Sequence, residues 1–202
     1  MNALTEKPPR ALDRAALNTL FHEARTANGF APTPVAPELL QDLIEATKMG
    51  PTAMNALPLR VVFVTSQEAR ERLKRLVSPG NVAKIESAPV TAILGRDLNF
   101  HEELPRLFPH APQPYFDNAK ANAESMSLQN ATLQAGYFIL AARALGLDAG
   151  PMGGFDAKAV DAEFFPDGAR KSILLVALGY GDDSKLFPRN PRLDFAEIAT
   201  IV

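Results

Sequence analysis

The sequence predicts a single domain of the α+β class. Short apolar runs of strand length, at residues 60–65, 89–94 and 173–178, are separated by longer stretches in which apolar residues recur at helical spacing. No internal repeat stands out, and 202 residues are enough for one sizeable hydrophobic core. We therefore expect one domain over residues 1–202, with more helix than strand.

Helical periodicity predicts five helices, at residues 11–24, 37–50, 67–76, 119–147 and 156–164. Pro37 suits the first position of its helix, where a missing N–H costs nothing. The longest stretch is apolar on most faces after Met126, which is typical of a helix in a domain core or between two subunits. Residues 1–10 read as a mobile lead-in.

Residues 97–118 stand apart from this pattern. They contain four prolines, two histidines and several aromatic side chains. Long irregular segments in compact domains often cover binding sites. We interpret this segment as a lid-like loop over a pocket, with internal packing or a dimer surface as the alternative.

Composition and spacing exclude several classes of function. A net charge of −2 leaves no basic surface for nucleic acid. The chain has no cysteine, and its three histidines lie apart without metal-ligand spacing, so we expect no metal site. The N-terminal residues lack an apolar signal core, and no run reaches the length of a membrane span. We expect a cytoplasmic protein that binds no nucleic acid and no membrane.

The stretch from Gly150 to Gly154 is the first candidate for a binding site. It follows the longest helical stretch, and its small side chains would let backbone amides approach a planar ligand closely. The alternative is a glycine-rich helix end that binds nothing.

Cations and amides recur at other predicted turns. They are Arg25, Asn55, Asn81, Lys84, Lys185, Arg189 and Arg192. Arginines hold phosphate in two-pronged contacts and amides read the edges of rings, so the set suits a ligand with a phosphate at one end and a polar heterocycle at the other. Flavin mononucleotide (FMN) has that form. Each residue alone has a structural explanation, such as an arginine at a helix C-terminus for Arg25.

Four motifs carry a family resemblance: GPTAMNALP, SPGNVAK, LGLDAGPMGGFDAKAVDAEFF and NPRL. In order and spacing they resemble the FMN-dependent nitroreductase family, over roughly residues 17–198. The stretches LFHEARTANGF and LGYGDDSKL are most similar to the branch of malonic semialdehyde reductases of pyrimidine catabolism. The GLDAGPMGGFD block is the most specific of these signals.

The resemblance implies a sandwich fold with a central, mostly antiparallel sheet flanked by helices. It also implies a homodimer with two FMN sites at the subunit interface, and ping-pong transfer of reducing equivalents from NADH or NADPH to a small-molecule substrate. The cofactor-binding residues that it implies are Arg25, Ala27, Asn28, Pro51, Thr52, Ala53, Asn55, Asn81, Lys84, Pro151, Met152, Gly153, Gly154, Lys185, Arg189 and Arg192.

Within that set the resemblance implies distinct roles. Arg25 and Arg192 would bind the phosphate, and Pro51, Thr52, Ala53 and Asn55 would approach the flavin from the other subunit. Lys84 would stabilise negative charge at N1 and O2 of the reduced ring, and backbone amides at residues 151–154 would lie near N5. No protein side chain would be a catalytic nucleophile, so catalysis would rest on positioning and electrostatics.

Several positions depart from the family pattern. Ala27 and Gly29 stand where a serine and a second basic residue are common, so Asn28, Lys185 or Arg189 would have to compensate. Gly153 replaces a frequent glutamate, and Leu59 a frequent aromatic residue.

The expected activity is reduction of malonic semialdehyde to 3-hydroxypropionate, with Arg106 of the lid as a candidate partner for the substrate carboxylate. A broad nitro or quinone reductase is the alternative among enzymes. A flavin carrier or sensor without turnover, and a cofactor-free dimeric scaffold, are the alternatives of other classes. The choice between NADH and NADPH stays open.

Overall fold

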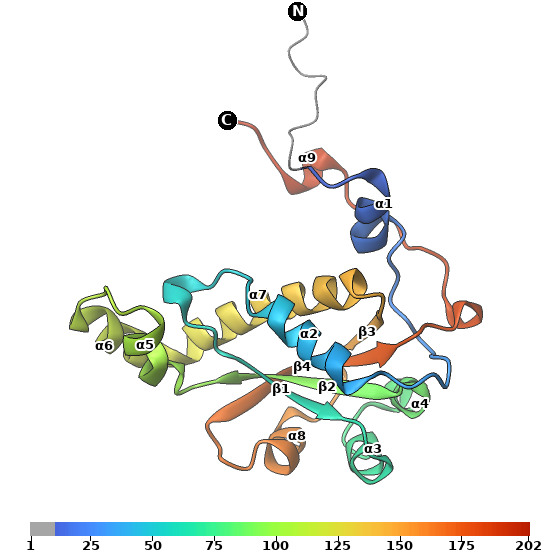
Figure 1. Cartoon of the computed structure of the whole chain (residues 1–202), viewed down its shortest axis with the longest axis horizontal. Coiled ribbons are helices and arrows are strands. Elements are labelled where there is room, and N and C mark those ends of the chain that lie inside the picture. The colour runs from blue at the N-terminus through green and yellow to red at the C-terminus, as the bar shows by residue number, and fades with distance from the viewer. Residues whose placement is uncertain (1–10) are drawn as a thin grey trace, which may run out of the picture.

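A four-stranded antiparallel sheet forms the centre of the protein (Figure 1). The computed structural model describes residues 11–202, so the expectation for residues 1–10 lies outside the described part. The strand order is β1 (Leu59–Val64), β2 (Val90–Asp97), β4 (Arg170–Gly179) and β3 (Asp148–Met152), and every neighbouring pair is antiparallel. This confirms the α+β class and the predicted antiparallel sheet.

Helices cover both faces of the sheet. On one face lie α2 (Pro37–Thr47) and α7 (Ala123–Ala144), and their buried side chains share a core with residues of all four strands. On the other face lie α3 (Gln67–Lys74), α4 (Pro79–Ser87) and α8 (Ala157–Phe164), which enclose a second core. β2 and β4 are the inner strands, which explains why their sequences read as continuous apolar runs.

Local sequence signals set where these helices begin. Pro37 and Pro79 open α2 and α4, where the missing N–H has no helical partner to lose. Ser66 and Asp156 cap α3 and α8, because their side chains accept hydrogen bonds from backbone N–H groups of the first turn.

The prediction of an irregular loop over residues 97–118 is wrong. The segment forms η3 (Phe100–Glu103), α5 (Leu104–Leu107) and the start of α6 (Gln113–Ala121), around a third small core that contains the fully buried Phe100. Two of its prolines open α5 and α6 instead of preventing helix formation. The long helical stretch is also divided, since α6 ends at Ala121 and α7 begins at Ala123.

The prediction of a turn at residues 150–154 needs correction too. Residues up to Met152 belong to β3, in which Gly150 pairs with Ala177 and Pro151 with Val176. The strand lies at an edge of the sheet, where a proline is tolerated because one side of the strand has no ladder partner. Only Gly153 and Gly154 lie beyond the strand.

The ends of the described chain are less regular. The first helical stretch is α1 (Arg14–Leu17) followed by a π-helical turn, η1 (Asn18–His22). The remaining short helices are η2 (Ala53–Asn55), η4 (Asp183–Lys185) and α9 (Phe195–Ile198). No helix within residues 11–202 is long and apolar enough to cross a membrane, and the cytoplasmic location stays a prediction.

Candidate functional site

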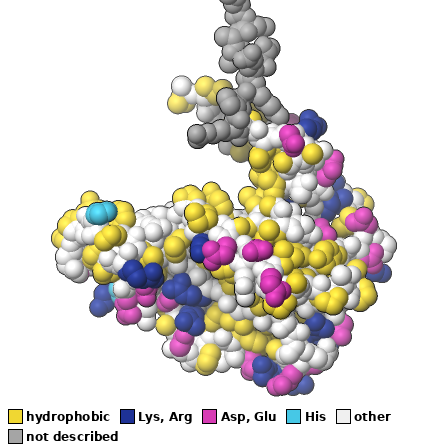
Figure 2. Space-filling model, viewed as in Figure 1, with side chains coloured by type: hydrophobic (Ala, Val, Ile, Leu, Met, Phe, Trp, Pro, Cys, Tyr) yellow, Lys and Arg dark blue, Asp and Glu magenta, His cyan; other side chains and the backbone are white. Residues whose placement is uncertain are grey.

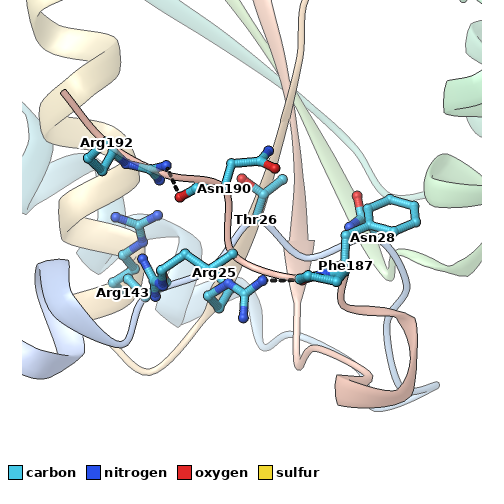
Figure 3. A pocket seen from close by; sticks show the side chains of 10 residues that line it. Arg25, Thr26, Asn28, Arg143, Phe187, Asn190 and Arg192 are labelled. Carbon is cyan, nitrogen blue, oxygen red and sulfur yellow. Dashed lines mark hydrogen bonds between the residues drawn. The ribbon is translucent and has the colours of Figure 1, made fainter.

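A pocket of about 290 Å³ lies between the end of the first helical stretch and the C-terminal segment (Figure 3). Four arginines line it, Arg25, Arg143, Arg189 and Arg192, and no acidic side chain is among the described residues of its wall. Uncompensated guanidinium groups in one concave site attract an anion, and their planar donors match phosphate or carboxylate. The structure thus brings Arg25 and Arg192, which the resemblance assigns to the phosphate, together with Arg189, one of the residues expected to compensate for Gly29.

Two of these arginines also hold the C-terminal segment in place. Arg25 donates a hydrogen bond to the carbonyl oxygen of Phe187, and Arg189 donates one back to that of Ala24, at 3.2 Å. These reciprocal bonds fasten residues 187–189 to residues 24–25, although more than 160 positions separate them in the sequence. Asn28, another predicted cofactor residue, lines the same pocket.

Arg143 is the site residue that sequence reasoning missed. It lies in the last turn of α7, where a cation is ordinarily explained by the helix dipole. Its Nη1 donates to the carbonyl oxygen of Leu20 at 3.0 Å, and burial lowers the pKa of its guanidinium. No local signal could have revealed it, because its neighbours in the pocket come from two distant segments.

The pocket is joined to β3 by the segment that follows Arg25. The backbone N–H of Ala27 donates to the carbonyl oxygen of Ala149 at 3.1 Å, and Thr26 forms a parallel bridge with the same residue. A Cβ at Gly150 would lie 2.5 Å from the carbonyl oxygen of Ala27. Glycine is therefore required at position 150 for this close approach.

Lys84 crosses the same glycine from the α4 side. Its Cδ lies 3.0 Å from where a Cβ of Gly150 would stand, and the residue is only 9% exposed. Burial lowers the pKa of its ammonium group. Within residues 11–202 this ammonium has neither an ion pair nor a hydrogen bond, whereas buried charges in proteins are normally paired.

Asn81 lies one turn before Lys84 and binds the backbone after β3. Its Nδ2 donates to the carbonyl oxygen of Gly154 at 2.9 Å, and the N–H of Ser78 donates to the same oxygen at 2.9 Å. The Asn81 side chain therefore has its Oδ1 left for an outside donor. A Cβ at Gly154 would lie 2.9 Å from Ser78 Oγ, whereas one at Gly153 would have no atom within 4 Å.

Lys185 lies against one of the positions that depart from the family pattern. A Cβ at Gly29 would lie 2.8 Å from Cγ of Lys185. The stem of Lys185 therefore occupies the space into which a side chain at position 29 would extend.

The loop from Pro51 to Pro58 is not part of this cluster within one chain. The N–H of Ala53 donates to Oδ1 of Asn130 in α7 at 2.7 Å. Asn130 and Arg143 are 13 positions apart on that helix, hence separated by about 20 Å along its axis. Figure 1 likewise shows the loop near α5 and α6, away from the end of α7 where β3 begins.

Unusual backbone geometry marks this loop. Met54, Asn55 and Leu57 have φ angles of 56°, 52° and 42°, in the left-handed region that residues with a Cβ rarely adopt. Thr52 Oγ1 accepts the N–H of Leu57 at 3.1 Å, and Asn55 Nδ2 donates to the carbonyl oxygen of Leu107 at 3.0 Å. Such strain persists only where the surroundings hold it, and it clusters at functional sites.

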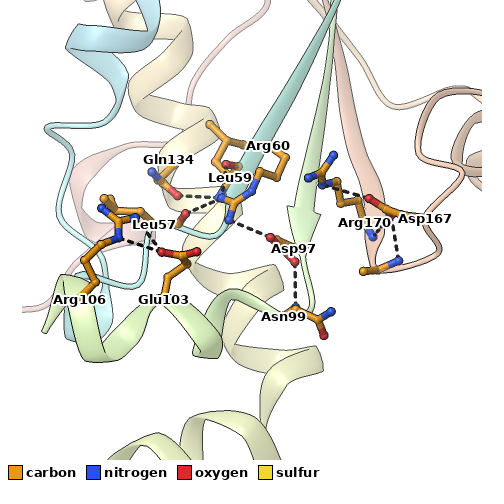
Figure 4. A network of polar contacts seen from close by, with 11 residues as sticks. Leu57, Leu59, Arg60, Asp97, Asn99, Glu103, Arg106, Gln134, Asp167 and Arg170 are labelled. Atoms are coloured by element: carbon orange, nitrogen blue, oxygen red, sulfur yellow. Dashed lines mark hydrogen bonds and ion pairs between the residues drawn. The ribbon is translucent and has the colours of Figure 1, made fainter.

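A polar network fixes the end of the loop where β1 begins (Figure 4). Gln134 Oε1 accepts the N–H of Leu59 at 3.0 Å, and Arg60 pairs with Asp97 at 2.8 Å. Nearby, Arg106 binds Glu103 within the same helical segment, at 2.8 Å, and its side chain is 74% exposed. Its charge is therefore partly compensated before any substrate arrives.

The described residues contain no group of three or more metal-ligating side chains.

The protein is thus an α+β protein with helices on both faces of an antiparallel sheet and a cluster of cationic side chains near its edge strand β3. The sequence model of the Nitroreductase family matches residues 22–180, and the chain belongs to this family.

Related proteins are similar in sequence over almost the whole chain. A protein from Leptothrix cholodnii with the provisional name NADH dehydrogenase/NAD(P)H nitroreductase is 58% identical over 187 residues, which are 92% of this chain and 95% of that protein. One of the same provisional name from Stenotrophomonas maltophilia is 55% identical over 192 residues, or 95% and 98% of the two chains.

Solved structures share the fold at low identity. A protein from Bacillus subtilis, provisionally a nitroreductase, has a TM-score of 0.81 at 23% identity, with 94% of this chain and 100% of that chain covered. Another from Exiguobacterium sibiricum, solved in complex with FMN, has a TM-score of 0.80 at 19% identity, with 95% and 98% covered. The nitroreductase-like fold and the family resemblance are confirmed, whereas the malonic semialdehyde reductase branch stays a prediction.

The two adjacent glycines give a matched pair of variants. Gly154→Ala is expected to lower the free energy of unfolding by about 1–3 kcal/mol, because its Cβ collides with Ser78 and Asn81. Gly153→Ala is expected to stay within about 0.5 kcal/mol of the wild type, since its Cβ meets nothing. Urea unfolding of both variants measures the difference, and equal effects would contradict the packing around Gly154.

Removing the charge of Lys84 is expected to stabilise the cofactor-free protein. Lys84→Met should raise the free energy of unfolding at neutral pH by about 0.5–2 kcal/mol, because a buried unpaired charge is replaced by an apolar chain of similar length. Because the folded-state pKa of Lys84 lies below its ordinary 10.5, the unfolded chain binds more protons between these two values. Wild-type stability gains a contribution that grows with pH across that window, and the variant lacks it.

Lys74→Met is the matched control. Glu86 and Glu71 pair with Lys74 and raise its pKa, so this substitution should bring no stabilisation. Urea unfolding at pH 7 and at several values up to 10.5 tests both variants. Destabilisation by Lys84→Met would show that the ammonium has a partner in the folded protein.

Proposed function

We propose that this protein is an FMN-dependent oxidoreductase that takes reducing equivalents from NADH or NADPH and passes them to a small acceptor in a ping-pong cycle. One observation carries the proposal. Thr26 and Asn28 of the four-arginine pocket flank Ala27, which contacts β3 at Gly150, and the buried Lys84, without a counter-ion in the described chain, approaches the same Gly150.

The residues present fit FMN. The described wall of the pocket carries four guanidinium groups and no acidic side chain, which suits a phosphate dianion. Lys84 offers a desolvated cation to the electron-rich edge of a ring, and Asn81 offers Oδ1 as an acceptor for a ring N–H. When bound, FMN supplies a ring that accepts a hydride at N5 and passes it on.

The chain's own residues would then bind and orient. Arg25, Arg189 and Arg192 hold the phosphate, helped by Asn28 in the same pocket. Lys84 stabilises negative charge on the reduced ring and thereby raises its reduction potential. Residues 151–154 would border the ring, and the exposed Gly153 would leave space in front of it for nicotinamide and then the acceptor.

A second copy of the chain would complete the site. Between Ser125 and Tyr137 the exposed side chains of α7 carry no charge, and Leu128, Leu133 and Tyr137 are 46%, 46% and 37% exposed. Figure 2 shows hydrophobic side chains along the upper edge of the body, where Figure 1 places α7. Apolar faces of this kind mark protein interfaces. We infer a homodimer in which Pro51, Thr52, Ala53 and Asn55 reach the partner's cofactor.

For the acceptor we propose malonic semialdehyde, in keeping with the stretches LFHEARTANGF and LGYGDDSKL. Its aldehyde carbon gains a hydride and its oxygen a proton, which gives 3-hydroxypropionate as NAD(P)H becomes NAD(P)⁺. The segment 97–118 would border this acceptor, because Asn55 binds the carbonyl oxygen of Leu107. Arg106 could meet the substrate carboxylate only by leaving Glu103.

A broad nitro or quinone reductase is the second candidate. The observation that favours it is the open space at Gly153, where a glutamate side chain is common in the family. A larger opening in front of the ring admits a flat aromatic acceptor.

Anaerobic stopped-flow of the FMN-loaded protein tests the activity and the acceptor together. NADH or NADPH is expected to bleach the flavin absorbance rapidly, and malonic semialdehyde to restore it at least about tenfold faster than a nitroaromatic at equal concentration. Restoration by the nitroaromatic alone would replace the first candidate with the second. Bound flavin that neither nucleotide bleaches would leave a carrier or sensor.

The homodimer is tested by a charge on α7. Leu133→Glu is expected to weaken self-association by about 2 kcal/mol or more, because an unpaired carboxylate would be buried in the interface. Ala162→Glu, an exposed site on α8 over the opposite face of the sheet, is the control and should stay dimeric. Sedimentation equilibrium measures both, and a wild-type monomer at micromolar concentration would contradict the dimer.

A further inference from the structure

Arg143, in the last turn of α7, lines the proposed site but belongs to none of the sequence motifs that predicted it. Arg143 lies in the wall of the four-arginine pocket, among residues 24–28, which follow the first helical stretch, and residues of the C-terminal segment. Figure 3 shows the side chains of Arg143, Arg25 and Arg192 around the same pocket. Arg143 is half-buried, in contrast to the exposed Arg189 and Arg192.

The contacts of Arg143 leave most of its donors free for a ligand. A guanidinium group carries five N–H donors. Within residues 11–202, the Arg143 side chain makes one hydrogen bond, which Nη1 donates to the carbonyl oxygen of Leu20. No carboxylate of the described chain lies within ion-pair distance of Arg143. The charge of Asp148 acts on the Arg143 guanidinium from farther away, and Asp148 itself accepts a hydrogen bond from the N–H of Gly181 at 2.7 Å.

We propose that Arg143 binds the phosphate of the ligand directly, as a fourth arginine beside Arg25, Arg189 and Arg192. This inference rests on the proposed binding of FMN. It assigns one phosphate contact to a rigid helix, whereas the other three come from irregular segments. Burial of the guanidinium favours the role, because a desolvated cation gains more from an anion than an exposed one does.

A purely structural role is the competing explanation. Arg143 could serve only to tie the end of α7 to Leu20. The two roles differ in what they do to flavins with and without a phosphate. A phosphate contact distinguishes FMN from riboflavin, whereas a structural tie supports both ligands equally.

The test compares FMN and riboflavin binding by fluorescence quenching in the full-length protein and in Arg143→Gln. The variant is expected to bind FMN about 10- to 100-fold more weakly, as for loss of a charged hydrogen bond, with riboflavin affinity unchanged. Arg143→Lys keeps the charge and is expected to recover part of the loss. Inorganic phosphate should raise the Tm of the cofactor-free wild type more than that of Arg143→Gln.

Arg70→Gln is the matched control. Arg70 is also half-buried, and its Nη2 also donates to a backbone carbonyl oxygen, that of Pro89, but it lies on α3 over the other face of the sheet. The substitution removes the same charge and should leave the ratio of FMN to riboflavin affinity unchanged.

Two results would overturn the role of Arg143: equal loss of FMN and riboflavin affinity in Arg143→Gln, or no loss of either. Failure of the wild type to bind any flavin would instead contradict the proposed function. In that case the Tm measurement with inorganic phosphate still tests the role of Arg143. A phosphate-induced Tm shift that is unchanged in Arg143→Gln would overturn the phosphate contact, and a reduced shift would support it.

Discussion

The contact between residues 25–27 and the edge strand β3 is the constraint on which the candidate site depends. The hydrogen bond from Ala27 to Ala149 covers part of an edge that would otherwise be open to pairing with another chain. It forms only because position 150 carries no side chain. The same vacancy admits the stem of Lys84, so one glycine brings the arginine pocket and the buried ammonium to the same strand.

This arrangement places like charges close together and leaves a lysine desolvated, which costs stability in the absence of a ligand. The surrounding fold compensates through two cores, one on each face of the sheet. The loop that holds Thr52 and Asn55 follows the same rule, since hydrogen bonds to Asn130 and Leu107 maintain a backbone that is unfavourable by itself. Several features that oppose stability thus lie where the proposed ligand would bind.

Sequence reasoning was reliable where side-chain pattern determines structure. Apolar runs located β1, β2 and β4, and predicted turns contained Arg25, Arg189 and Arg192. β3 was missed because its Gly150 and Pro151 lack strand propensity, and pairing with β4 overrides that preference. Residues 97–118 were misread because prolines at helix starts look the same in sequence as prolines in loops. The place of Arg143 in the pocket could not be predicted from the sequence, because it depends on which distant segments come together in the fold.

The helix α7 carries Asn130, which holds the 51–58 loop, and Arg143, which lines the arginine pocket. A helix advances about 1.5 Å and turns about 100° with each residue, so the spacing of these two side chains fixes both a length and an orientation. A single residue inserted between them would swing one contact away from its partner segment, and it would also turn part of the buried face of α7 away from the core that this helix shares with the sheet. An insertion in the middle of α7 should therefore disturb both ends of the candidate site at once, although neither end lies near it in the sequence.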